Sequence, residues 1–174
     1  NRGMNMKDRI KFSDEMLAAV IDGRKTQTRR IMKPQPVLNG NFYEVFGAGW
    51  SKGIKRVTVV PGHSLERNFP YGLVDKKIPF ADKDGNIKGE IEIVDVWLQQ
   101  AQDISEEDAI AEGVVTGRYG NEGNWLRGFY APGGNQPHQN AKSAYSEIWR
   151  SIYGVEAWYK NPWCWVIEFK RIQG

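Results

Sequence analysis

Cysteine and histidine are scarce in this chain of 174 residues. It has one cysteine, Cys164, and two histidines, His63 and His138. A single cysteine excludes a disulfide within the chain, and a reducing, cytoplasmic compartment is its simplest setting. The three side chains lie far apart in the sequence without zinc-ligand spacing, and neither histidine sits in a recognisable catalytic motif. We therefore expect no required metal.

Long hydrophobic runs and phosphate-binding loops are also missing. No apolar run approaches the length of a transmembrane helix, and the N-terminus lacks the apolar core of a signal peptide, so no membrane association is expected. The runs NEGNW and APGG do not have the spacing of a phosphate-binding loop. We therefore expect no cofactor.

An excess of charge of one sign is absent as well. Lys and Arg number 24, Asp and Glu 21, and the net charge is +3. This balance permits an anionic partner such as RNA but does not require one. The cations nevertheless cluster at residues 24–30 and 52–56, and the acids cluster at 103–112.

Turn-forming and aromatic residues are plentiful. Nineteen Gly and eight Pro favour a strand-rich or mixed architecture over a helical bundle. Apolar residues are 40% of the chain and aromatic residues 12%, which suffices for one core. We expect a leader or expression remnant at residues 1–8 and a single domain at 9–174. Within that domain, residues 37–69 are expected to be an insertion or a pair of hairpins.

Hydrophobic periodicity predicts the main elements of this domain. Helices are expected at 14–22, between Ser105 and Gly113, and at 141–153. Residues 114–140 are expected to be loop. Strands are predicted at 9–12, 26–32, 55–60, 161–172 and in a hairpin that turns at Asp84 and Gly85. This order predicts the α+β class, as a small closed or partly closed β-barrel with helices packed at its ends.

The run DGRKTQTRR, residues 22–30, is the densest polar segment of the chain. A lysine near a hydroxyl can act as a general base when burial lowers its pKa, and arginines can bind a phosphate or a base edge. Alternatively, the run is a solvated strand, and residue types alone favour that interpretation. Lys25 and Thr28 have opposite parity in a strand, so they share a site only if Lys25 lies in a turn, which Gly23 makes feasible. Thr26 and Gln27 are expected to be strand filler.

Glu112 is unusual among the clustered acids. It is predicted in the last turn of its helix, where the helix dipole disfavours a carboxylate. It is either a carboxylate that enters a pocket, where it would orient a lysine or take a proton, or one more surface acid.

The aromatic residues divide into two groups. Trp97, Trp149, Trp163 and Trp165 lie on patterned elements and are expected in the core. Others lie in loop-like contexts where they could stack on a base. These are Trp50, Trp125, Tyr130, Trp158 and Tyr159.

Several ordered blocks resemble the ASCH family, whose fold is a PUA-like β-barrel. They are IKFSDEMLAAVIDGRKTQTRR, PYG, ISEEDAIAEG, AYSEIWRSIYG and NPWCWVIEFKRI. The family hallmark, G-x-K-x-x-T-x-R, falls on Gly23, Lys25, Thr28 and Arg30. The asparagine-proline-tryptophan before the last strand resembles forms found in bacteriophages and prophages. The run after PYG departs from the family pattern.

The resemblance implies a function and a set of site residues. One family member hydrolyses the amide of N4-acetylcytidine with a lysine, a threonine and a glutamate, which correspond here to Lys25, Thr28 and Glu112. The expected function is such a hydrolysis on RNA or a modified nucleoside. A non-catalytic RNA-binding module and a metal-independent ribonuclease are the alternatives. The expected substrate-binding or RNA-binding residues are Arg24, Arg29, Arg30, Tyr71 and Trp125.

Overall fold

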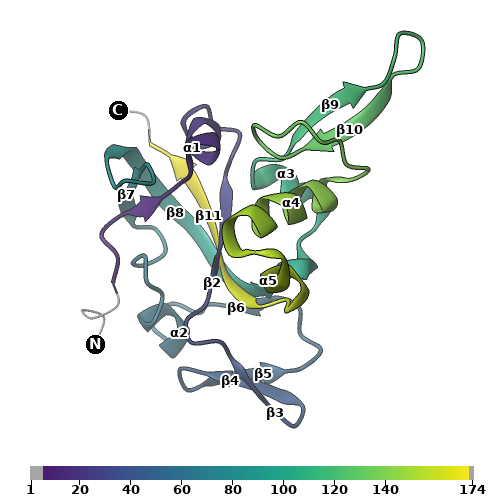
Figure 1. Cartoon of the computed structure of the whole chain (residues 1–174). Coiled ribbons are helices and arrows are strands. Elements are labelled where there is room, and N and C mark those ends of the chain that lie inside the picture. Colours follow the sequence, from purple (N-terminus) through teal and green to yellow (C-terminus); the bar gives the residue numbers. More distant parts are fainter. Residues whose placement is uncertain (1–5, 173–174) are drawn as a thin grey trace.

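The computed structural model describes residues 6–172 and has the α+β architecture that the sequence predicts. Its centre is a mixed sheet with the strand order β1-β7-β8-β11-β2, and β6 pairs with β8 (Figure 1). Strands β1 and β7 are parallel, and the other pairs are antiparallel. The strands are β1 (Ile10–Lys11), β2 (Gln27–Ile31), β6 (Val57–Thr58), β7 (Lys77–Ala81), β8 (Ile87–Gln100) and β11 (Trp163–Arg171). Residues 1–5 of the expected leader lie outside the described residues.

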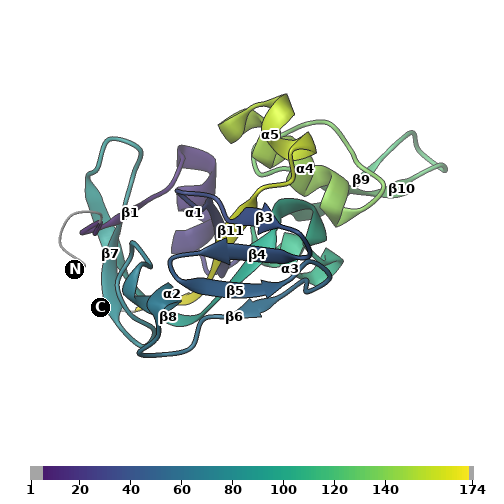
Figure 2. The same ribbon diagram turned by 90° about the horizontal axis from the view of Figure 1, so that it is seen from below.

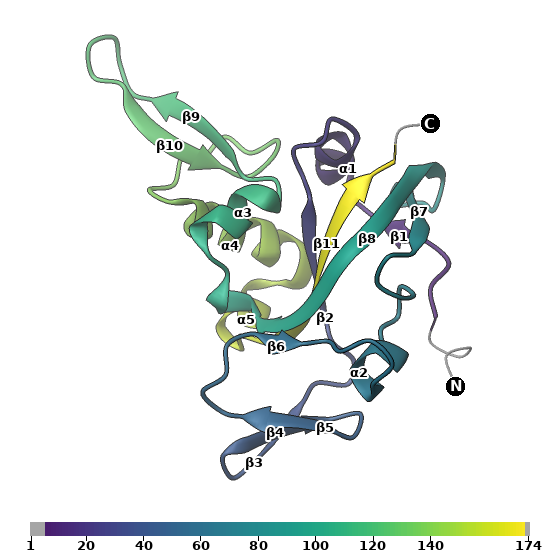
Figure 3. The same cartoon turned by 180° about the vertical axis from the view of Figure 1, so that it is seen from behind.

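Strand β8 is long and strongly bent, and it curls the sheet into a half-barrel (Figure 3). It pairs along its length with β11, whose residues from Trp163 to Ile167 are buried on both faces. The predicted alternation of this last strand is therefore replaced by a continuous apolar run, as expected for a strand covered on both sides. The partly closed barrel predicted from the sequence is confirmed in this half-barrel form.

Helix α1 (Asp14–Ile21) leads the chain from β1 to β2. The Ser13 side chain accepts a hydrogen bond from the Met16 backbone N–H, and two acids occupy the first turn, where the helix dipole favours them. Gly23, with φ +84°, makes the turn after the helix. The Lys25 backbone N–H then donates to the Ala19 carbonyl, which holds Lys25 against the helix end and ahead of β2. Lys25 thus lies in the turn that the sequence required.

Three of the remaining helices lie together on one side of the half-barrel (Figure 1). They are α3 (Glu106–Ala111), α4 (Ala141–Tyr153) and α5 (Val155–Tyr159), and the 3-10 turn η1 (Ala101–Asp103) precedes α3 in the chain. The Glu106 carboxylate accepts hydrogen bonds of 2.8 Å from the backbone N–H groups of Ala141 and Lys142, so it caps α4 from α3. This contact ties the N-terminal end of α3 to the start of α4.

The expected insertion contains a separate three-stranded antiparallel sheet (Figure 2). Its strands are β3 (Val37–Asn39), β4 (Phe42–Val45) and β5 (Ala48–Ser51), and helix α2 (Ser64–Arg67) follows β6. Tyr43 and Trp50 pack edge-on against Trp163, with ring centroids 5.2 and 5.1 Å away. Trp50 is therefore a buried packing residue. The strand predicted at 55–60 shortens to Val57–Thr58.

The prediction of loop for residues 114–140 is wrong at 115–119 and 126–130, which are strands, and holds for the residues between and after them. Strands β9 (Val115–Tyr119) and β10 (Leu126–Tyr130) pair as a hairpin that projects away from the body (Figure 1). Its tip needs glycine, because Gly120 has φ +120° and a Cβ there would lie 2.4 Å from the Asn124 carbonyl oxygen. The glycines and asparagine that suggested a loop belong to this turn, while the apolar and aromatic residues on either side form the strands.

Candidate functional site

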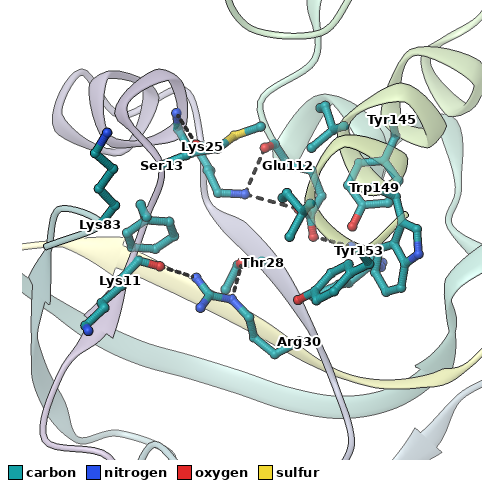
Figure 4. Close-up of a pocket in the computed structure, with 15 residues that line it drawn as sticks. Lys11, Ser13, Lys25, Thr28, Arg30, Lys83, Glu112, Tyr145, Trp149 and Tyr153 are labelled. Atoms are coloured by element: carbon teal, nitrogen blue, oxygen red, sulfur yellow. Dashed lines mark hydrogen bonds and ion pairs between the residues drawn. The ribbon is translucent and has the colours of Figure 1, made fainter. Parts of the chain in front are cut away.

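A cavity of about 300 Å³ lies between the β1–α1–β2 segment and helices α3 and α4 (Figure 4). Lys25, Thr28 and Glu112, the three residues that the ASCH resemblance singles out, all line it. The other lining residues are Lys11, Phe12, Ser13, Met16, Arg29, Arg30, Lys83, Tyr145, Ile148, Trp149, Ile152 and Tyr153. The structure thus brings a turn and the strand that follows it together with a helix end more than eighty residues away in sequence.

The Lys25 amine is buried and held by three acceptors. Its Nζ donates to the backbone oxygens of Gln27 at 2.7 Å and Glu112 at 2.9 Å, and to the Glu112 carboxylate at 3.1 Å. Burial lowers the pKa of Lys25, while the Glu112 carboxylate acts in the opposite direction. Exclusion of water destabilises the charged form of Lys25, and the ion pair with Glu112 offsets part of that loss.

Glu112 is the C-cap residue of α3, and its carboxylate joins two cations. One oxygen accepts from Lys25, and the other accepts from the Arg29 Nη1 at 2.9 Å. All three side chains are nearly inaccessible to solvent. The position that the helix dipole disfavours is therefore stabilised by two buried positive charges.

Arg29 and Gln27 anchor this group to the sheet. Arg29 also donates to the side-chain oxygens of Gln99 at 2.9 Å and Asp108 at 3.4 Å, and Gln27 accepts from Arg29 at 3.0 Å. The Gln27 amide in turn donates to Asp108. Gln27 is buried and bridges several groups, so the expectation that it is strand filler is wrong. Its partners lie on β2, α3 and β11, which sequence position alone does not connect.

Thr28 and Arg30 form a second, separate set of contacts. The Thr28 hydroxyl oxygen accepts from the Arg30 Nε at 3.1 Å, which leaves the hydroxyl proton available to another group. Arg30 also reaches from edge strand β2 to edge strand β1, where its Nη2 donates to the Lys11 carbonyl at 2.8 Å. Its guanidinium lies near the rings of Phe12 and Tyr71, at 5.2 and 5.8 Å from their centroids. Arg30 therefore spans the open side of the half-barrel beside the cavity.

Helix α4 supplies an aromatic wall to the cavity (Figure 4). Burial, followed by the nearby Glu112 carboxylate, raises the pKa of Tyr145 well above its ordinary value. Burial also raises the pKa of Tyr153. The sequence pattern predicts Trp149 in the core, but it gives no sign that this face of the helix borders a cavity.

The other residues predicted to bind substrate or RNA lie outside the cavity. Arg24 is exposed, and its Nε pairs with Asp22 at 2.8 Å. Tyr71 is buried in a neighbouring pocket, where its hydroxyl lies 3.5 Å from the Arg30 Nη1. Trp125 is half exposed at the start of β10, with the Arg118 guanidinium 5.7 Å from its ring centroid. These three residues are not part of the convergent group.

The described part of the chain contains neither a cluster of metal ligands nor a helix that could span a membrane. No group of three or more His, Cys, Asp or Glu side chains among residues 6–172 could hold a metal ion. No helix within the same range is long and apolar enough to cross a membrane. Cys164 is buried, and burial raises the pKa of its thiol above the ordinary range.

Comparisons with known proteins give similarities only at the level of solved structures. No family model and no curated protein matches the sequence. The structure is similar to an Enterococcus faecalis V583 protein described under the family name DUF984, with 15% identity, a TM-score of 0.49 and coverage of 97% of this chain and 78% of the other. It is also similar to an ASCH domain from Lactobacillus crispatus JV V101, with 14% identity, a TM-score of 0.47 and coverage of 95% and 80%.

Proposed function

We propose that the cavity binds a modified cytidine, in RNA or as a nucleoside, and hydrolyses its N4-acetyl amide. The single observation that carries this proposal is the convergence of Lys25, Thr28 and Glu112 on one cavity. The ASCH resemblance assigns these three residue types to that reaction. Sequence alone had left the alternative that they are solvated surface groups, but each is at most 4% exposed.

The cavity has the surface character that a nucleoside needs. Phe12, Tyr145 and Tyr153 offer aromatic surface for a base, and the cations Lys11 and Lys83 lie at the border. Glu112 is the one carboxylate among the described lining residues, and both of its oxygens are paired with cations. An anionic ligand therefore meets little repulsion there.

Lys25 acts as the base in this proposal. In the molecules in which the lowered pKa leaves Lys25 neutral, its amine takes a proton from water, and the resulting hydroxide adds to the acetyl carbonyl carbon. The carbon–nitrogen bond then breaks as the Lys25 ammonium returns the proton to the departing N4 amine. Cytidine and acetic acid are the products, and Lys25 is neutral again. Burial supports this role because it lowers the pKa of Lys25.

The neighbouring groups orient the reaction. Thr28 can donate its hydroxyl proton to the attacking water or to the carbonyl oxygen, because its own oxygen is occupied by Arg30. Glu112 holds the Lys25 amine in place, and Arg29 holds Glu112. Trp125 enters the proposal as a peripheral surface on which a neighbouring RNA base stacks.

Acetate release from N4-acetylcytidine and from acetylated RNA tests the reaction. Lys25→Met is expected to lower the rate by about 10²–10⁴-fold, as for removal of a general base. Thr28→Val and Glu112→Gln are expected to lower it as well, while Arg24→Gln, an exposed site outside the cavity, serves as the control. Circular dichroism checks that each variant is folded. Absence of acetate release from the wild-type protein would exclude this function, and fragmentation of labelled RNA in the presence of chelator would favour a ribonuclease.

The hydrogen bonds of Lys25 favour one alternative, an RNA-binding module without chemistry. An ammonium has three protons, and the structure provides three acceptors for them, which is also the arrangement of a purely structural buried lysine. This alternative predicts salt-dependent RNA binding by the wild-type protein without acetate release.

A further inference from the structure

A second pocket, of about 360 Å³, lies beside the cavity and is strongly cationic. Lys7, Arg30, Lys33 and Arg67 line it, and none of the described lining residues is acidic. Lys33 and Arg67 are exposed, and the Arg67 Nη1 donates a hydrogen bond to the Gly62 carbonyl at 2.8 Å. Cations without a matching carboxylate point to an anionic ligand.

Aromatic rings form the rest of this pocket. Phe46, Phe69, Tyr71 and Trp165 all border it. Phe46 is at the tip of the β4–β5 hairpin in a left-handed conformation, φ +54°, which the two-residue turn with Gly47 requires and which is rare for a bulky side chain. Its ring stacks on Trp165, with centroids 6.5 Å apart and planes at 21°. Phe69, Tyr71 and Trp165 are buried, whereas Phe46 is partly exposed. Cations beside a partly exposed aromatic ring are a combination that single-stranded nucleic acids bind.

The two recesses share a wall. Arg30 and Tyr153 line both the cavity and the second pocket. Arg30 has five N–H donors, and its Nε and Nη2 are occupied by Thr28 and Lys11, while its Nη1 has only a long contact of 3.5 Å to Tyr71. It therefore retains donors for a phosphate placed between the two recesses.

We propose that the second pocket is a subsite for a flanking nucleotide, so that the ligand is single-stranded RNA rather than a free nucleoside. The inference rests on the proposed function in one respect, namely that the cavity takes the cytidine. The linking phosphate contacts Arg30, the neighbouring base lies against Phe46 and Tyr71, and Lys33 and Arg67 receive the next phosphate. Phe46, Arg67, Asn68 and Phe69 of the pocket lining come from residues 37–69, and this gives the expected insertion a role in substrate selection.

Binding measurements with probes of increasing length test this subsite. The probes are cytidine, cytidine 3′-monophosphate, the cytidine-containing dinucleotides with a neighbour on the 5′ or the 3′ side, and a single-stranded pentanucleotide. The wild-type protein is expected to bind one dinucleotide and the pentanucleotide at least about tenfold more tightly than cytidine 3′-monophosphate. Equal affinity for the dinucleotides and the mononucleotide would overturn the proposal.

Two variants localise the effect. Phe46→Asn removes the ring but suits the left-handed backbone, and the double variant Lys33→Gln with Arg67→Gln removes two charges. Each variant is expected to lose at least half of the dinucleotide's gain in affinity over cytidine 3′-monophosphate, on a logarithmic scale. Its affinity for cytidine is expected to stay unchanged. The charge-matched control is Lys52→Gln with Lys55→Gln, two exposed lysines of the same segment outside the pocket. Equal weakening by the control would reduce the effect to non-specific charge and overturn the proposal.

Failure of the subsite and failure of the proposed reaction are distinguishable. Acetate release from N4-acetylcytidine, without any gain in affinity from a flanking nucleotide, contradicts the subsite alone. A gain in dinucleotide affinity that depends on Phe46, without acetate release from N4-acetylcytidine or acetylated RNA, supports the subsite and contradicts the proposed reaction. If no probe binds, both proposals fall.

Discussion

Arg29 and Arg30 are neighbours in β2 and have no side-chain hydrogen-bond partner in common. Arg29 is 3% exposed and bonds to Gln27, Gln99, Asp108 and Glu112. Arg30 is half-buried and contacts Thr28, Tyr71 and the Lys11 carbonyl on the open side of the half-barrel. Successive strand residues point to opposite sides, so one arginine is committed to the interior and the other faces the recesses.

This difference separates the roles that the sequence had given jointly to the arginines of residues 22–30. An arginine whose donors are used inside the protein has little left for a ligand, and its charge is needed to balance Glu112. We therefore propose that Arg29 positions the site and that Arg30 is the arginine that contacts a substrate. The predictions below test this division.

The largest expected effect is on stability and separates the two arginines. Arg29→Met leaves the buried Glu112 carboxylate with one cation instead of two, and we expect the free energy of unfolding to fall by about 3–5 kcal/mol. Arg30→Met is expected to cost less than about 1 kcal/mol, because a partly solvated group is replaced. Urea unfolding of both variants gives the comparison. Equal losses would mean that the two arginines play the same structural part.

The next effect is on RNA affinity, where the Arg30 substitution is expected to have the larger effect of the two arginines. Arg30→Met removes charge-assisted donors beside the cavity, so we expect single-stranded RNA to bind about 1.5–3 kcal/mol more weakly. Arg30→Lys keeps the charge without the planar donor pair and is expected to fall between wild type and Arg30→Met. Fluorescence anisotropy at constant salt measures all three. An unchanged affinity in Arg30→Met would remove Arg30 from the binding surface.

Local signals in the sequence were sufficient for much of the framework that carries Lys25. The Ser13 cap, the apolar stripe of α1 and the turn at Gly23 are contiguous, and each acts over a few residues. The hairpin at β9 and β10 was missed because the glycines at its tip were given more weight than the strand-like runs beside them. Its flanking runs contain the β-branched and aromatic residues that would have identified it.

The division between Arg29 and Arg30 was not accessible from sequence. Strand parity places the two side chains on opposite sides, but it does not say which side is closed. That is decided by α3, which brings Glu112 and Asp108 onto the Arg29 side from about eighty positions away. Pairing of Lys25 with Glu112 came from the family resemblance, because no local pattern links a turn to a distant helix end.

A pH effect compares the two buried cations. Arg29 stays charged in any accessible range, whereas burial lowers the pKa of Lys25 below its ordinary 10.5. Between that lowered pKa and about pH 10, the unfolded chain binds a proton at Lys25 that the folded protein does not. The free energy of unfolding of wild type should therefore rise relative to Lys25→Met, with a slope of up to about 1.4 kcal/mol per pH unit. Below the lowered pKa, the difference in the free energy of unfolding between wild type and Lys25→Met should not change with pH. A difference that is independent of pH over the whole range would show that Glu112 fully offsets the effect of burial on the pKa of Lys25.

The smallest expected effect belongs to Arg24, the third arginine of the segment. Its Nε pairs with Asp22 at 2.8 Å, and the Arg24 guanidinium, through its hydrogen bond and charge, holds the pKa of Asp22 below its usual range. Both side chains are about half exposed, so solvent screens the pair and other groups can replace it. Arg24→Gln should leave the melting temperature, acetate release and RNA affinity unchanged within measurement error. A clear loss of RNA affinity in this variant would extend the ligand past the mouth of the cavity to the end of α1, and Arg30 would then be one of two exposed arginines that contact it.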